Sequence, residues 1–267
     1  MGRLENENLY VPVGEKRGVA RLFDKYDLPS GRSILKTVAL ALAVLLVVWL
    51  ILLIFGLRLT KVKYDDGRSY SYFGFMWGDT PTAGRWNCSD GSSAKVGGGK
   101  VNYSDGSIYS GDLKGFLKDG QGTFAQADGS AYVGGFKDDL FEGNGKITFA
   151  DGSTYEGGFS GGLYEGQGEI RADDGKLVYS GSFEKGEKHG TGTYYYENGD
   201  SFSGVFENDM RKSGVYTWRS GESIEGEFVN NLPDPTKKVI YTDTVGTTYK
   251  AYYKNGELSE KQRYYAD

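Results

Sequence analysis

The sequence predicts an all-β array of repeated β-hairpins preceded by a single transmembrane α-helix. Three observations support this fold class. A run of 21 residues near the N-terminus carries no charge, one short pattern recurs at a nearly constant step, and Asp-Gly or Asn-Gly pairs follow at the same step. A fixed period of roughly 20–50 residues is typical of arrays in which each unit contacts only its neighbours.

The composition excludes most catalytic chemistry. The 267 residues include 42 Gly and 21 Tyr, but one His and one Cys. These two residues cannot by themselves form a zinc site or a disulfide within the chain. We therefore expect a protein that is not an enzyme, with no catalytic residue, no metal, no cofactor and no nucleic-acid partner.

The N-terminal tail, residues 1–33, contains one short helical pattern. Val19, Leu22, Phe23 and Tyr26 are spaced i, i+3, i+4 and i+7 among basic residues. This spacing indicates an amphipathic helix that lies on an anionic leaflet or docks to a cytoplasmic partner. Chance patterning in a disordered tail explains the spacing equally well.

Residues 34–57 are predicted to span a membrane. Thr37–Leu57 has no charged side chain, and a helix of this length spans about 31 Å, close to the hydrocarbon thickness of a bilayer. A cleavable signal peptide is the alternative, but its apolar run is shorter and ends in small residues. Here the run ends in Phe-Gly-Leu before Arg58, which favours an anchor in the cell membrane.

The distribution of charge favours one orientation. Within about 20 residues of the span, five basic residues precede it and four follow it, and extending the count to the N-terminus gives seven before it. This asymmetry predicts a cytoplasmic N-terminus and extracytoplasmic repeats. From residue 58 onward the chain carries 24 basic and 31 acidic side chains, a net charge of −7. We therefore expect the array not to bind anionic lipid.

Residues 97–230 repeat one unit. The pattern Tyr-x-Gly-x-Phe, or a close variant, recurs at steps of 23, 23, 24 and 23 residues, and each of the first four copies is followed by Gly-x-Gly and then by Asp-Gly or Asn-Gly. The first residues of the five copies are Tyr109, Tyr132, Tyr155, Tyr179 and Phe202.

Each unit is predicted to form a β-hairpin. Side chains alternate along a strand, so Tyr132, Gly134 and Phe136 share one face. Asp-Gly between two alternating runs is a strong hairpin signal. Glycine normally weakens a strand. Its regular placement here predicts that aromatic rings from adjacent strands lie over bare backbone.

These residues resemble the MORN (membrane occupation and recognition nexus) repeat. Glu187–Gly192, with its His-Gly-x-Gly element, is closest to the family pattern. The resemblance extends over residues 97–230 and implies an elongated, twisted antiparallel sheet with a curved groove. It also implies a scaffold or binding module, since members of the family serve mainly in these roles and some of them act at membranes.

The two ends depart from the pattern. Residues 58–96 are interpreted as a linker and N-terminal cap, and 231–267 as a degenerate C-terminal repeat and cap, because terminal repeats usually protect an exposed edge strand. The fifth copy keeps only Gly214 of its glycine pair, and in the last half unit Ala251 replaces the glycine.

The predicted function is that of a single-pass, membrane-anchored scaffold that uses the array as a protein or glycan interaction platform. The candidate binding residues form the aromatic stripe of a groove: Tyr109, Tyr132, Tyr155, Tyr179 and Phe202. The alternative for these rings is that packing consumes them entirely. The alternative function is a lipid-binding tether whose array contacts a membrane surface, which the net charge of −7 disfavours.

Overall fold

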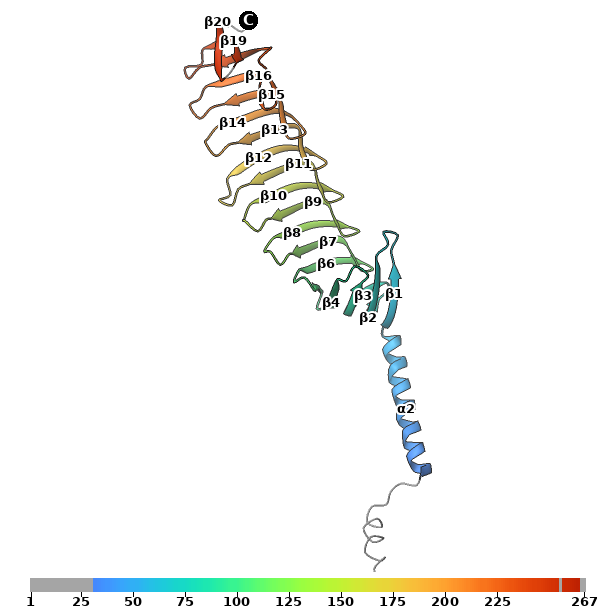
Figure 1. Ribbon diagram of the computed structural model, residues 1–267. Coiled ribbons are helices and arrows are strands. Elements are labelled where there is room, and N and C mark those ends of the chain that lie inside the picture. The colour runs from blue at the N-terminus through green and yellow to red at the C-terminus, as the bar shows by residue number, and fades with distance from the viewer. Residues whose placement is uncertain (1–30, 255, 265–267) are drawn as a thin grey trace, which may run out of the picture. The chain divides into compact units, whose positions relative to one another are not determined.

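The computed structural model describes residues 31–254 and 256–264, and the chain forms two compact units, Met1–Phe55 and Gly56–Asp267. The first unit contains helix α2 (Gly31–Ile54), and the second contains one twenty-stranded sheet (Figure 1). This confirms the predicted fold class. The helical pattern at Val19–Tyr26 lies outside the described residues.

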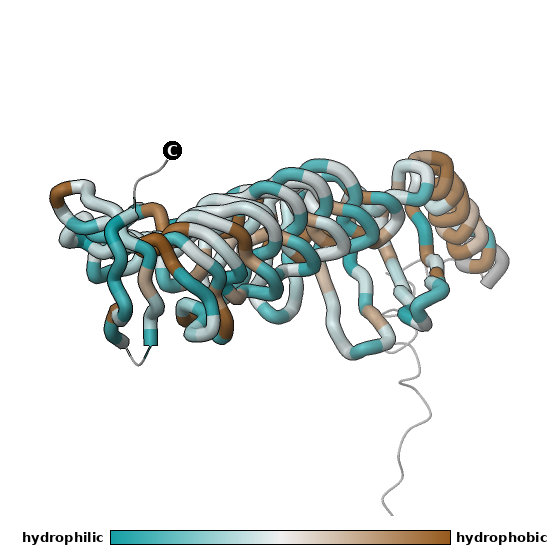
Figure 2. Tube along the Cα trace, turned by 90° about the horizontal axis from the view of Figure 1, so that it is seen from above, coloured by the Kyte–Doolittle hydropathy of each residue, from teal (hydrophilic) through white to brown (hydrophobic). Residues whose placement is uncertain are grey.

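Helix α2 is apolar from Val38 to Ile54 (Figure 2), and within that stretch all side chains except Leu52 and Leu53 are exposed. By length and composition it could cross a membrane, and a signal sequence would meet the same description. The helix ends three residues before the predicted boundary at Leu57. Gly56 has a φ of 95°, which favours glycine after a helix end, and Leu57 already pairs with Phe75 in the sheet.

The sheet is a meander in which nearly every strand pairs antiparallel with the next strand of the chain (Figure 1). Near the C-terminus β16 pairs with both β17 and β18, and the sheet ends with β19 and β20. The strands are β1 (Leu57–Lys63), β2 (Ser69–Trp77), β3 (Thr80–Cys88), β4 (Ser93–Gly97), β5 (Lys100–Tyr103), β6 (Ile108–Lys114), β7 (Leu117–Ala125), β8 (Ala131–Lys137), β9 (Leu140–Thr148), β10 (Thr154–Ser160), β11 (Leu163–Arg171), β12 (Leu177–Glu184), β13 (Glu187–Tyr195), β14 (Ser201–Glu207), β15 (Met210–Thr217), β16 (Ser223–Val229), β17 (Leu232–Pro233), β18 (Lys238–Thr242), β19 (Thr248–Lys254) and β20 (Glu257–Arg263).

Two kinds of turn alternate along the array. The Asp-Gly pairs lie in the longer kind: Gln126 N donates to Ser130 O, and Gly129, with a φ of 93°, donates its N–H to Gln126 O. The shorter kind has two residues with positive φ, such as Asp138 and Asp139, and matches the type I′ turn that suits the twist of paired strands. The sequence pattern indicated the first kind only.

A ladder of aromatic rings forms the core. Tyr155 is fully buried, and its ring meets Phe159 of its own strand at 5.1 Å and Phe183 of the next repeat at 5.3 Å between centroids, both edge to face. Tyr132 makes the same two contacts with Phe136 and Phe159. Each phenylalanine therefore joins one repeat to the next, which couples the repeats through nearest neighbours.

Glycine lies beneath these rings, as predicted. A Cβ added to Gly145 would lie 2.5 Å from Cε2 of Tyr132, and one added to Gly157 would lie 2.6 Å from Oη of Tyr155. The tyrosine hydroxyls donate to backbone carbonyls three residues further on, at 2.9 Å from Tyr132 to Gly135 and at 2.9 Å from Tyr155 to Gly158. These carbonyls lie where the strand register shifts, so each tyrosine hydroxyl also supplies a hydrogen-bond donor to a carbonyl in an irregular part of the strand.

The first strands pack against the first repeats. The Tyr70 ring stacks on Phe116 at 5.2 Å, and the Arg68 guanidinium pairs with Asp139 at 2.8 Å across 71 positions of sequence. Tyr72 reproduces the repeat geometry: its hydroxyl donates to Phe75 O at 2.7 Å, and a Cβ on Gly74 would lie 2.5 Å from that hydroxyl. The segment from Tyr72 is thus a further repeat that the sequence pattern did not reveal.

Candidate interaction surface

The predicted aromatic stripe lies on one face of the sheet but is buried. Its five rings are 0–2% exposed. Tyr132 is among the residues that line one open cavity. The burial favours the packing alternative for the rings themselves, so a contact surface on this face depends on the side chains beside them.

A flanking row of half-buried side chains lies across each hairpin from the stripe. Strand pairing places Ile147 opposite Tyr132 and Ile170 opposite Tyr155 on the same face. Each residue of the flanking row lies directly opposite at least one stripe residue on a neighbouring strand, and the row consists of Phe124, Ile147, Ile170, Tyr194 and Tyr216. The sequence pattern did not identify this row.

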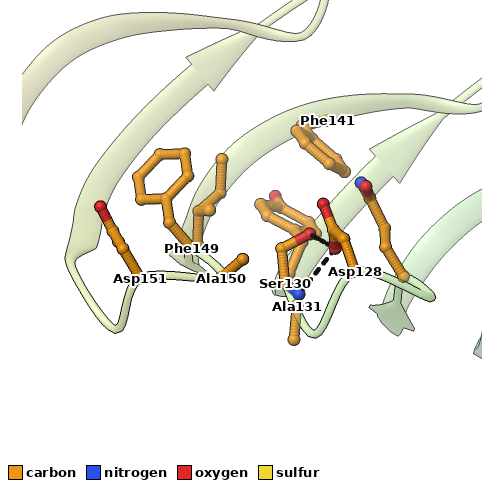
Figure 3. A pocket seen from close by; sticks show the side chains of 10 residues that line it. Asp128, Ser130, Ala131, Phe141, Phe149, Ala150 and Asp151 are labelled. Atoms are coloured by element: carbon orange, nitrogen blue, oxygen red, sulfur yellow. Dashed lines mark hydrogen bonds between the residues drawn. The ribbon is translucent and has the colours of Figure 1, made fainter.

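One cavity beside the flanking row has a volume of about 480 Å³ and lies between two successive longer turns (Figure 3). Tyr132 and Ile147 line this cavity together with Phe149, which is 37% exposed. Its lining residues are Gln126, Asp128, Ser130, Ala131, Tyr132, Phe141, Ile147, Phe149, Ala150 and Asp151. The apolar wall and the polar turns together suit a partner that offers both apolar and polar groups.

Two carboxylates border this cavity. Asp128 accepts hydrogen bonds from Ser130 Oγ at 2.7 Å and from Ser130 N at 2.8 Å, and Asp151 accepts the same pair of bonds from Ser153. These bonds, the hydroxyl bond above all, hold the pKa of both carboxyls below the ordinary value. The edge of the cavity is therefore negatively charged at neutral pH.

Four rings form an aromatic cluster on the last repeats. Ring centroids lie 4.7 Å apart for Tyr194 and Tyr196, 5.7 Å for Tyr196 and Tyr216, and 5.3 Å for Tyr216 and Trp218. All four side chains are half-buried. The Arg211 guanidinium lies 5.2 Å from the Tyr216 centroid, within cation–π range. At the positions of Tyr194 and Tyr196, the earlier repeats have Ile147 and Phe149 or Ile170 and Ala172. The change to two tyrosines is the feature of the sequence that could have indicated this cluster.

Acid is expected to destabilise the array through its turns. Asp90, Asp105, Asp128 and Asp151 each have a pKa lowered by a serine hydroxyl and backbone N–H. A carboxyl whose pKa is lower in the folded state than in the unfolded state stabilises the fold at any pH above its unfolded-state pKa. This stabilisation is lost as the pH falls through the folded-state pKa. The melting temperature should therefore hold between pH 7 and 5 and fall below about pH 4.

Thermal melts of the wild type and of Asp128→Asn/Asp151→Asn check this expectation. The double variant keeps an acceptor oxygen in both turns but removes two titrating groups, so its melting temperature should depend less steeply on pH. An identical acid dependence in both proteins would contradict a role for these turn carboxylates.

In the described part of the chain, no group of three or more His, Cys, Asp or Glu side chains has the arrangement of a metal site. His189 lies 3.7 Å from Glu184 at the surface, and Cys88 is buried with 8% of its area exposed.

The chain is similar to known proteins in its repeats. The family model of the MORN repeat matches residues 132–154, 155–176, 179–201 and 213–223. None of the curated proteins matches the chain significantly. One similar solved structure is the TCP domain of SAS-4 (dCPAP) from Drosophila melanogaster in complex with a proline-rich motif of Ana2 (dSTIL). It is 15% identical, and the match covers 54% of this chain and 82% of that chain. Its TM-score is 0.26.

Proposed function

We propose that this chain, whose residues 132–223 contain MORN repeats, is a single-pass membrane-anchored scaffold whose array binds a protein partner. The flanking row is the observation that carries this proposal. It presents half-buried aromatic and aliphatic side chains, and the stripe residues beside it are buried in the core. Half-exposed aromatic side chains are enriched in protein interfaces.

The charge of the array suggests the chemistry of the partner. Residues 101–267 carry 17 basic and 27 acidic side chains, a net charge of −10. Asp128 and Asp151 place part of that charge beside the apolar cavity. We therefore expect a partner segment with apolar side chains flanked by Lys or Arg. The same charge disfavours the lipid-tether alternative for the array.

Site-specific photo-crosslinking tests the binding face. A photoreactive phenylalanine at position 149 should give a discrete protein adduct in native membranes, because Phe149 lines the cavity and is 37% exposed. Val133, 55% exposed on the opposite face of the sheet, is the matched control position and should give no such adduct. Equal adducts from both positions, or none from position 149, would contradict the proposal.

Membrane anchoring and orientation need a separate test. Cys88 is a poor reporter because it is buried, so we suggest a Cys88→Ser background with either Ser30→Cys or Val245→Cys. Val245 is 84% exposed. In intact cells an impermeant maleimide should label Val245→Cys, and Ser30→Cys should react only after permeabilisation. The reverse pattern would place the array in the cytoplasm, and loss of residues 1–54 from the mature chain would indicate a signal peptide.

A further inference from the structure

The first hairpin of the array unit exposes an apolar patch. Strand pairing sets Leu59 directly opposite Phe73, and these side chains are 83% and 61% exposed. The adjacent pair on the same face is Leu57 and Phe75. Exposed apolar side chains that adjoin one another in this way mark an interaction site more often than isolated ones.

The hairpin between β2 and β3 adds an exposed tryptophan. Trp77, 84% exposed, ends β2. Its neighbour Met76 donates its N–H to Gly56 O at 2.9 Å, so Trp77 lies at the level where the array unit begins. Trp77 also lines a hollow with Val101 and Leu113, so we call Leu57, Leu59, Phe73 and Phe75 the cap patch.

Basic side chains follow the cap patch on the same face. Lys61 and Lys63 continue β1 beyond Leu59, and Arg85 pairs with Phe73 on one side and with Lys95 on the other. All four are exposed, and within residues 31–254 and 256–264 none of them has an ion pair within 4.0 Å. One face thus changes from apolar to basic over two residues of strand, about 7 Å.

Charge also separates this region from the rest of the array. Residues 56–100 carry seven basic and four acidic side chains, a net charge of +3, against −10 for residues 101–267. Anionic lipid headgroups attract basic segments beside a membrane, and aromatic side chains are enriched at the level of the headgroups. The cap patch and its border combine aromatic and basic side chains in this way, whereas the later repeats are acidic.

Chain connectivity limits where the cap patch can lie. Two residues, Phe55 and Gly56, separate Ile54, the last residue of α2, from Leu57, the first residue of β1. The three steps between these Cα atoms span at most about 11 Å. If α2 crosses a bilayer, the start of β1 therefore lies at the boundary between hydrocarbon and headgroups.

We propose that the cap patch inserts into the interfacial layer of an anionic lipid leaflet, with Lys61, Lys63, Arg85 and Lys95 on the headgroup phosphates. The inference rests on the proposed anchoring by α2. It assigns lipid contact to the cap alone and leaves the array face free for a protein partner. Two attachments, a spanning helix and an inserted hairpin, would restrict how the array can tilt over the membrane.

Lipid quenching of an environment-sensitive fluorophore tests this contact on the full chain in nanodiscs with anionic lipid. The fluorophore is attached in the Cys88→Ser background to Leu59→Cys, with Val44→Cys in α2 as the control for anchoring and Val133→Cys as the control for water exposure. Quenchers on the lipid should quench the labels at positions 44 and 59, and the label at position 133 should respond only to an aqueous quencher.

The outcomes separate the two proposals. A lipid-exposed label at position 44 with a water-exposed label at position 59 overturns the cap contact and leaves the anchor standing. Water exposure at position 44 contradicts the anchor itself. Protection at position 59 that requires two chains per disc also overturns the proposal, because it assigns the cap patch to a second copy.

Charge variants complete the test. Replacing Lys61, Lys63, Arg85 and Lys95 by Gln should reduce lipid quenching at position 59 several-fold in anionic discs, and high salt should have a similar effect on the wild type. The matched control replaces four lysines of the array, Lys137, Lys146, Lys176 and Lys185, by Gln and should leave the quenching unchanged. An equal loss in both variants would contradict a headgroup contact specific to the cap.

Discussion

Tyr155→Ala is expected to lower the free energy of unfolding by roughly 3–5 kcal/mol, the usual cost of removing a buried aromatic side chain. Tyr155 is fully buried and stacks on Tyr164 at 3.7 Å between centroids. It also contacts Phe159 in its own repeat and Phe183 in the next. Its loss therefore opens a cavity at a junction between repeats.

Urea denaturation of the full chain in detergent, followed by circular dichroism, measures this change. Tyr155→Phe keeps the ring and loses only the hydrogen bond to Gly158, so its cost should be about 1 kcal/mol. Tyr195→Ala is the matched control, because Tyr195 is 43% exposed. A Tyr155→Ala variant as stable as the Tyr195→Ala control would contradict the ring ladder as the core of the array.

Gly145→Val is expected to cost roughly 1–3 kcal/mol, in the range for overpacking a filled core. The space above Gly145 is occupied by the Tyr132 ring, whose Cε2 would lie 2.5 Å from the new Cβ. That ring is itself held by stacking on Phe141 at 3.8 Å and by its hydrogen bond to Gly135, so it cannot move aside without losing contacts.

Gly97→Val is the control for this substitution. Gly97 also lies in a strand, but no heavy atom beyond its chain neighbours lies within 4 Å of a Cβ placed there. Valine also has a higher strand propensity than glycine. The urea midpoint of Gly97→Val should therefore match or exceed that of the wild type. An unchanged midpoint for Gly145→Val would mean that the glycines are not platforms for the rings.

Short-range patterns predicted most of the fold. Tyr132, Gly134 and Gly145 lie within one unit, so the alternation of side chains and the repeat period were sufficient to predict a ring over bare backbone. The two-residue turn at Asp138 and Asp139 escaped prediction because this turn contains no glycine, although both residues have positive φ.

Long-range packing explains what the sequence did not reveal. The Arg68–Asp139 ion pair joins residues 71 positions apart, and Tyr72 precedes Tyr109 by more than one period, which concealed its repeat. The burial of the stripe depends on contacts between repeats, as between Tyr155 and Phe183. The flanking row and the cap patch are defined by exposure, which follows from packing and not from the repeat pattern alone.

Cysteine footprinting in native membranes tests most directly the claim that one face of the array is a binding surface. Phe149→Cys and Trp218→Cys report on that face, and Val133→Cys reports on the opposite face, all in the Cys88→Ser background. If a partner occupies the face, a small permeant thiol reagent should label positions 149 and 218 several-fold more slowly in native membranes than in the purified protein. Labelling at position 133 should not change. If each of the three positions is labelled at the same rate in native membranes as in the purified protein, the claim is contradicted.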